Sequence, residues 1–224
     1  MPAPGFNYAS PSALFTFDVN TSPFFKKDAN NYINVLGIQQ LNTIGNASLL
    51  DIYLSAGNVV EPHIHQNSNE LVYCVSGSAV VSVINPYTNT LNNYPIQAGQ
   101  VAMAPQGWLH YEVAQADHTH LIAIFDAPQP DVIFGSDMLR LTPPNVIAYT
   151  YCLDTAKLKE VLAPLTSTVI IGPPSDCKIA QVQGVSTSNQ PTRSVPNRPN
   201  GSGERRCVIG NGWAYQNQEN VAIE

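Results

Sequence analysis

The sequence predicts an all-β domain, a barrel or sandwich of antiparallel strands, with short helices near its C-terminal side. Short runs of apolar or alternating residues follow one another and are separated by clusters of Gly, Pro, Asn and Ser. Only 12% of the 224 residues are charged, and the abundant Asn, Gln, Ser and Thr suit strands and turns better than helices. Helical spacing of apolar residues occurs only after the last of these runs.

The expected strands are short and follow one another in chain order. They cover residues 14–17, 38–44, 49–55, 59–65, 71–75, 79–84, 91–96, 101–104, 108–113 and 121–125. Residues 136–141 have the pattern of a short helix. Asp154 is a predicted N-cap for a second helix through residue 162, where Leu158 and Val161 have helical spacing. A pair of prolines breaks the chain between the two helices.

The length allows one well-buried core with additional segments and is short for two full domains. We expect an N-terminal arm and strands over 1–45, a barrel core over 46–128, a helical segment over 129–175 and a flexible tail over 176–224. The tail is expected to be flexible because it has few apolar anchors. Cys177 and Cys207 flank a polar stretch and could form a disulfide in an oxidising compartment, but the cysteine count does not decide this.

Charge and hydropathy argue against two classes of partner. The formal net charge is −6 and no run of Lys and Arg occurs, so we expect no nucleic-acid partner. The longest apolar runs are too short to span a bilayer, so we expect no membrane partner. The first ten residues lack the charged and apolar regions of a signal peptide, which makes a cytoplasmic location the default expectation.

The residues that could bind a metal ion or take part in catalysis lie in two stretches. His63 and His65 stand two apart on a predicted strand, so both imidazoles project to the same face. A polar QNSN turn follows, and Glu70 opens the next strand, where an antiparallel neighbour can present its carboxylate to the same point. Farther along, a turn built from Pro and Gly delivers His110 at the start of another strand. The sequence therefore predicts a site of three imidazoles and one carboxylate.

These stretches, GNVVEPHIHQNSNELVYCVSG and GQVAMAPQGWLH, resemble the paired signature motifs of the cupin superfamily in residue types and in spacing. The segments SPFFKKDANNYINVLG and FGSDMLRLTPPNVIA, together with the first motif, are similar to the bacterial oxalate decarboxylase and germin-like branch. The resemblance implies a single-domain cupin with the double-stranded β-helix, or jelly-roll barrel. One departure is Ala114, which stands where the second motif usually closes with Asn.

The resemblance also implies one divalent transition metal ion per chain, bound by His63, His65, Glu70 and His110. The mixed nitrogen and oxygen donors suit Mn, Fe, Ni or Zn, although Zn prefers four-coordinate closure. The similar branch usually carries Mn or Fe, so Mn is expected first and Fe next. Open coordination positions on such an ion suit inner-sphere binding of a carboxylate or dioxygen.

The expected function is therefore oxidase, dioxygenase or decarboxylase chemistry on a small carboxylate or oxygenated compound. Oxalate itself is not the expected substrate. Related decarboxylases carry an arginine, and related oxidases an asparagine, three residues before the first histidine, where this chain has Val60. The decarboxylase lid carries a glutamate, whereas the matching loop here offers only Asp131.

Two alternatives remain beside an enzyme of that kind. One is a non-catalytic metal-binding or storage-type cupin with a structural ion, and the other is a germin-like superoxide dismutase. An accessible pocket at the ion would favour turnover, and a site plugged by side chains would favour a structural ion.

Glu112 lies two residues beyond His110 on the same predicted strand, so its carboxylate is expected to face the barrel interior. There it could transfer protons or support a ligand histidine, which makes it a candidate catalytic residue. The alternative is a local bulge that turns it to solvent. A second His-x-His pair, His118 and His120, follows a hairpin loop without further ligands at suitable spacing and is interpreted as surface.

Assembly is inferred by analogy alone. Germin-like cupins commonly dimerise by exchanging N-terminal strands and packing C-terminal helices. The resemblance therefore implies a homodimer or a higher homo-oligomer, with the aromatic-rich segment 8–25 as the exchange arm.

Overall fold

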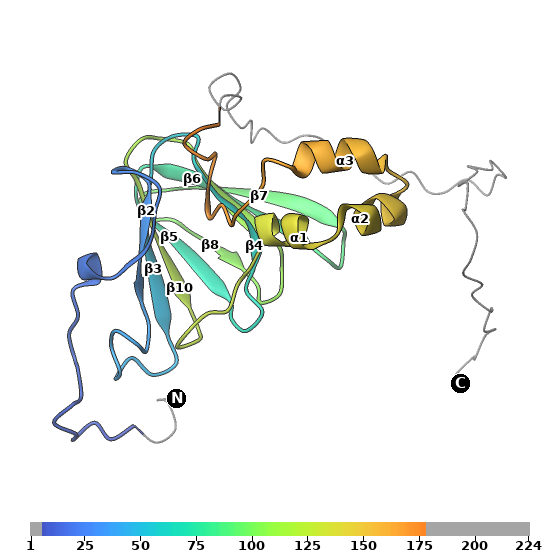
Figure 1. Ribbon diagram of the computed structural model, residues 1–224. Helices are drawn as coiled ribbons and strands as arrows, with labels where there is room; N and C mark the ends of the chain where they lie inside the picture. The colour runs from blue at the N-terminus through green and yellow to red at the C-terminus, as the bar shows by residue number, and fades with distance from the viewer. Residues whose placement is uncertain (1–5, 178–224) are drawn as a thin grey trace, which may run out of the picture.

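Two antiparallel sheets face each other in the computed structural model, which describes residues 6–177 (Figure 1). The first sheet contains, in spatial order, β1 (Pro23–Lys26), β2 (Tyr32–Leu36), β3 (Ser48–Leu54), β10 (Thr119–Phe125), β5 (Glu70–Ser76) and β8 (Val101–Ala104). The second contains β11 (Ile133–Phe134), β4 (Val59–Ile64), β9 (His110–Ala114), β6 (Ser78–Asn85) and β7 (Thr90–Gln97), and β12 (Ile171–Gly172) also pairs with β4. This arrangement confirms the predicted jelly-roll barrel.

Three short helices follow the barrel strands and lie at one side of the barrel in Figure 1. They are α1 (Gly135–Leu141), α2 (Pro144–Tyr151) and α3 (Thr155–Leu162). The carboxylate of Asp154 accepts the backbone N–H groups of Ala156 and Lys157, as predicted for the N-cap of α3. A 3-10 turn, η1 (Val19–Thr21), interrupts the N-terminal arm.

The predicted strands between residues 49 and 125 are confirmed, whereas the two N-terminal ones are wrong. Residues 14–17 belong to an exposed arm that pairs with no described strand. Residues 38–44 form a loop, in which the backbone N–H of Ile38 donates to the carbonyl of Pro128. The apolar residues of this loop recur every third position, so they do not alternate as strand residues do.

The expected elements also lack four strands, β1, β2, β11 and β12, and the helix α2. β1 and β2 form a hairpin whose apolar pattern is interrupted by the polar segment KKDANN. The helix α2 begins within the proline pair. Pro144 is its first residue, where the backbone N–H of a helix has no intrahelical acceptor and proline is therefore tolerated.

The hydrophobic core lies between the two sheets. Its fully buried members include Ile52, Leu54, Val72, Val81 and Leu121, which come from strands of both sheets. The thiol of Cys74 is buried among them and acts as a small apolar group.

Several predictions concern parts of the chain beyond the described residues. The expected flexible tail, 176–224, falls almost wholly there, and so does Cys207 with its proposed disulfide. The division of the chain at residues 45, 128 and 175 and the cytoplasmic location stay predictions. No helix within residues 6–177 has the length and apolar character needed to cross a bilayer.

Gly77 joins β5 to β6 at a crowded turn. Its φ of +72° lies in the left-handed region, and a Cβ there would meet the Cα of Thr119 at 2.7 Å. Gly57 also has a left-handed φ, +79°, but a Cβ there would have no neighbour within 4 Å. A side chain at Gly57 would cause backbone strain alone, whereas one at Gly77 would cause backbone strain and a steric clash.

We expect Gly77→Ala to lower the free energy of unfolding by about 3 kcal/mol or more, and Gly57→Ala by only about 1–2 kcal/mol. Urea denaturation of the two variants measures the difference. Equal losses in both would contradict the close approach of Thr119 to Gly77.

Candidate metal centre

The structure brings the four predicted ligands together inside the barrel. His63 lies on β4 and His65 directly after it, Glu70 opens β5, and His110 opens β9. All four side chains are buried, and one potential ligand atom from each lies within 4.8 Å of the others. These residues could therefore hold a metal ion between the two sheets.

A register shift in β4 helps to aim His63 inward. Val60 pairs with Glu112 and His63 pairs with His110, so three steps along β4 match two steps along β9. The additional residue on β4 has the effect of a β-bulge, and Pro62 there has no N–H to donate to the ladder. Val60 and His63 consequently both contact the interior, although they are an odd number of residues apart.

The shift turns Glu61 toward the helical segment instead. Its carboxylate accepts the N–H of Ser136 at 2.7 Å, the hydroxyl of Ser136 at 2.8 Å and the N–H of Ile170 at 2.7 Å. The N–H of Val169 also donates to it, at 3.2 Å. Glu61 thereby ties β4 to the start of α1 and to the segment before β12. Sequence analysis missed this role, and the available signal was an acidic residue between apolar strand positions.

Each ligand imidazole is fixed by its second nitrogen. The Nδ1 atoms lie 2.7–2.8 Å from backbone carbonyl oxygens, in the pairs His63 with Glu61, His65 with Asp131, and His110 with Trp108. A carbonyl oxygen only accepts, so each Nδ1 carries the proton. The three Nε2 atoms then face the common centre, as in metal sites whose histidines are held by carbonyl groups.

Glu70 lies at the meeting point of these nitrogens. Its Oε2 is 2.7 Å from Nε2 of His110, 3.2 Å from Nε2 of His65 and 3.6 Å from Nε2 of His63. The Nε2 of His65 is buried and forms no hydrogen bond with any residue between 6 and 177. A buried nitrogen lone pair with no donor is unfavourable, and a cation at this point would satisfy it. The residues therefore fit a divalent transition metal ion.

Burial and mutual contacts shift the pKa values of the four side chains. Burial lowers the pKa of His63. Burial opposes ionisation of Glu70, yet its hydrogen bond with His110 and its close contacts with the other two imidazoles hold its pKa well below the usual value. Burial also opposes the charge on His110, but the Glu70 carboxylate outweighs it and raises the pKa of His110 to about 9. The cluster thus favours an ionised Glu70, the form that binds a cation.

Glu112 faces the barrel interior, as predicted for its strand position. The expected alternative, a bulge that turns it to solvent, is wrong because the register shift lies on β4 and leaves β9 regular. The side chain is 1% exposed, and neither carboxylate oxygen has a hydrogen-bond partner among the described residues. Burial, together with the nearby Glu70, raises the pKa of Glu112 to about 8.

The second His-x-His pair forms no comparable site. His118 is exposed, whereas His120 is half-buried and its Nε2 lies 2.5 Å from Oδ1 of Asp51. The ring of His120 also stacks on Tyr53, with centroids 4.3 Å apart. In the part of the chain that the structure describes, His118, His120 and Asp51 do not bring three ligand atoms together.

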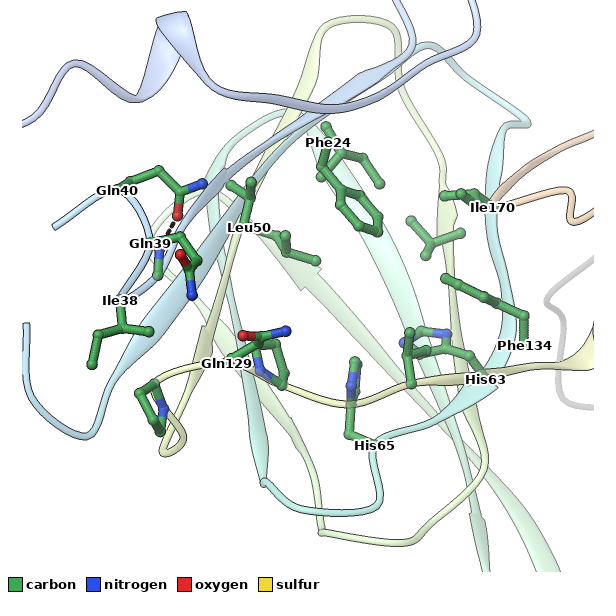
Figure 2. A pocket seen from close by; sticks show the side chains of 17 residues that line it. Phe24, Ile38, Gln39, Gln40, Leu50, His63, His65, Gln129, Phe134 and Ile170 are labelled. Carbon is green, nitrogen blue, oxygen red and sulfur yellow. Dashed lines mark hydrogen bonds between the residues drawn. The ribbon is translucent and has the colours of Figure 1, made fainter. Parts of the chain in front are cut away.

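A cavity of about 250 Å³ opens onto the centre from the side of His63 and His65 (Figure 2). Its walls are mostly apolar and come from both sheets and from the loops that follow β2 and β10. The principal apolar side chains are Phe24, Leu50, Val60, Val132, Phe134 and Ile170. Val60 occupies the wall where the oxalate decarboxylase motif would place an arginine.

The loop after β10 connects this cavity to the centre. The amide of Asn67 donates to the carbonyl of Gln129 and accepts the N–H of Asp131, at 3.1 and 2.8 Å. The carbonyl of Asp131 in turn accepts the Nδ1–H of His65. Gln129 lines the cavity, whereas the exposed side chain of Asp131 does not.

Fold and site together define a jelly-roll β-barrel with a buried three-histidine, one-glutamate group that could hold a metal ion. The chain belongs to the cupin family, whose family model matches residues 20–159. The predicted family is thereby confirmed.

Similar proteins come from the germin-like branch. Germin-like protein 8-14 of Oryza sativa subsp. japonica is 28% identical over 141 residues, covering 59% of this chain and 60% of that protein. Auxin-binding protein ABP19a of Prunus persica is 29% identical over 133 residues, covering 54% of this chain and 59% of that protein. The predicted similarity to this branch is confirmed, although the chain spans only about 60% of the length of these relatives.

Solved structures share the fold at lower identity. A mutant of Bacillus subtilis oxalate decarboxylase OxdC matches with a TM-score of 0.61 and 21% identity, over 71% of this chain and 43% of that chain. Coconut allergen cocosin matches with a TM-score of 0.64 and 21% identity, over 70% of this chain and 43% of that chain.

Two of the buried glutamates, Glu61 and Glu112, have different surroundings and make a matched pair for a stability test. We expect Glu112→Met to raise the free energy of unfolding by about 1–3 kcal/mol, because it removes buried polar atoms that have no partner. Glu61→Met should lower it by about 3 kcal/mol or more, because four donors lose their acceptor. Urea denaturation at pH 7 after treatment with a chelator measures both. A loss of stability in both variants would contradict the isolation of the Glu112 carboxylate.

Proposed function

We propose that this chain is a metal-dependent cupin enzyme, an oxidoreductase or lyase that acts on a small oxygen-bearing compound. The observation that carries the proposal is the cavity, which opens onto His63 and His65 where four donor atoms converge. A structural ion is usually closed off by its ligands, whereas a catalytic ion keeps a position for substrate. The open cavity therefore favours turnover over a purely structural ion.

The proposed ion is held by His63, His65, Glu70 and His110. When bound, a divalent redox-active ion supplies a Lewis-acid centre with coordination positions for an oxygen ligand. With the ion in place of the Nε2 proton of His110, the chain contributes three neutral imidazoles oriented by their Nδ1–H bonds, and one negative charge from Glu70. The apolar walls exclude bulk water, which strengthens electrostatic interactions inside the site.

Mn is proposed as the ion and Fe as the next candidate. The donor set admits both. Mn is supported by the fold shared with Bacillus subtilis oxalate decarboxylase, a protein with Mn(II) centres. Oxalate is not proposed as the substrate, because no Lys or Arg is among the described residues that line the cavity.

Glu112 is proposed as a catalytic residue that holds a proton inside the barrel. Support comes from its position two residues from His110 on the interior face, and from the absence of a described partner for either oxygen. A buried carboxylate without a structural partner is unfavourable for folding, and such groups concentrate at functional sites.

We expect purified protein to contain about one Mn or Fe ion per chain, by elemental analysis and electron paramagnetic resonance. His63→Ala and His110→Ala should each reduce metal affinity by at least ~10-fold, because even residues that only support a ligand contribute that much. His120→Ala is the matched control and should retain the metal. Protein that neither contains nor takes up a transition ion at pH 7 would refute the proposed function.

The same preparations separate the roles of Glu70 and Glu112. Glu112→Gln should keep its metal and lose turnover of any substrate identified by screening, whereas Glu70→Gln should lose metal as well. Unchanged turnover in Glu112→Gln would leave the residue without a catalytic role.

We also propose that the chain forms a homodimer or a higher homo-oligomer, with a second copy covering the outer face of β5, β8 and β10. Leu71 pairs with Met103 on one side and with Ile124 on the other, and Tyr73 pairs with Val101. All five side chains are 37–52% exposed and form one contiguous apolar patch. Patches of this kind mark protein interfaces.

Light scattering should accordingly show more than one chain per particle in the unmodified protein. The double variant Leu71→Lys with Ile124→Lys should shift the mass to that of one chain, because a second copy would bury unpaired charges. Leu91→Lys, on β7 and outside the patch, should leave the mass unchanged. A monomeric unmodified protein would contradict this assembly.

A further inference from the structure

The cavity beside the proposed ion restricts which molecules can reach it. Its volume of about 250 Å³ is just below the ~300–1,000 Å³ of typical small-molecule pockets. It therefore admits a compact organic molecule rather than a polymer or a large cofactor.

The walls of the cavity are largely apolar, and their polar side chains are uncharged. In Figure 2, Phe24 and Leu50 lie across the cavity from His63 and His65, and Phe134 lies next to His63. The polar side chains on the walls besides the histidines are neutral glutamines, among them Gln40, whose Oε1 already accepts the N–H of Gly37. None of the described lining residues is Lys, Arg, Asp or Glu.

The lining of the cavity sets a limit on the ligand. One oxygen-bearing group of the ligand can meet the ion on the side of His63 and His65. A second charged group would have to lie against Phe24, Leu50 or Val60 without a counter-charge, which is strongly unfavourable.

We infer that the substrate has one oxygen-bearing head, which meets the ion, and an uncharged hydrocarbon tail, which fills the cavity. This inference rests on the proposed function and specifies its substrate class. Phe24, Leu50, Val60 and Phe134 select the tail by apolar contact, and compounds with a charged group at the far end are rejected.

Two 2-oxo acids test the tail while the head stays the same. Calorimetric titration of Mn-loaded protein compares 4-methyl-2-oxopentanoate, which has a branched hydrocarbon tail, with 2-oxoglutarate, whose tail ends in a second carboxylate. We expect the former to bind at least ~30-fold more tightly, because it buries apolar surface and no charge. Equal affinities, tighter binding of 2-oxoglutarate, or no binding of 4-methyl-2-oxopentanoate would overturn the inference.

Variants at Phe24 test the wall itself. This side chain is 44% exposed, so charged replacements are tolerated by the fold, and circular dichroism checks this. Phe24→Arg should strengthen 2-oxoglutarate binding by about tenfold and Phe24→Asp should weaken it further, because they place opposite charges in the cavity wall. Leu91→Arg, at a position 43% exposed outside the cavity, should change neither affinity. The same response to both charges at Phe24 would contradict the assignment of this wall.

A metal-free comparison separates this inference from the proposed function. Chelated protein is examined by saturation-transfer NMR with 4-methylpentan-2-one and with 4-oxopentanoate, which share a methyl ketone and differ in the charge of the tail. The neutral ketone should show the stronger transfer. Failure of metal uptake with this preference retained would refute the proposed function and leave the selection of the tail standing, whereas loss of the preference would refute the inference about the tail.

Discussion

The hydrogen bonds between the Nδ1 atoms of three histidines and backbone carbonyl groups are the constraint on which the centre depends. The acceptors belong to β4, to the turn before β9 and to the loop after β10, so the backbone of the barrel itself sets the direction of each imidazole. A centre held in this way requires little rearrangement when it binds a ligand. The polar cluster is consequently as rigid as the strands and loops around it.

Two buried glutamates show how the same side chain serves different purposes in this barrel. Glu61 is satisfied by four donors and joins the second sheet to the helical segment. Glu112 lies on the neighbouring strand and has no such partner in the described chain. The bonding of Glu61 stabilises the fold, whereas the carboxylate of Glu112 is an exception to the rule that buried polar groups are paired. Exceptions of this kind are expected where a protein carries out chemistry.

Much of the barrel and the composition of the centre could be predicted from sequence because both rest on local periodicity. Alternation located the strands from β3 to β10, and a spacing of two residues placed His63 and His65 together. The β1–β2 hairpin was missed because polar residues interrupt its pattern. The inward position of Glu112 followed from periodicity. The bulge in β4 depends on pairing with residues of β9 that are distant in the sequence, and the bonding of Glu61 depends on residues 75 to 109 positions away. The cavity could not be predicted from sequence either, because its walls come from segments that touch only in the folded chain.

The loop after β10 performs two tasks with one stretch of backbone. Its Asp131 carbonyl orients His65, and its Gln129, Val132 and neighbouring prolines form part of the cavity wall. An altered loop that admitted a differently shaped molecule would also release the imidazole that it holds. A change of selectivity is therefore easier to make at Phe24 and Leu50, which lie on strands of the opposite sheet and do not hold His65 in place.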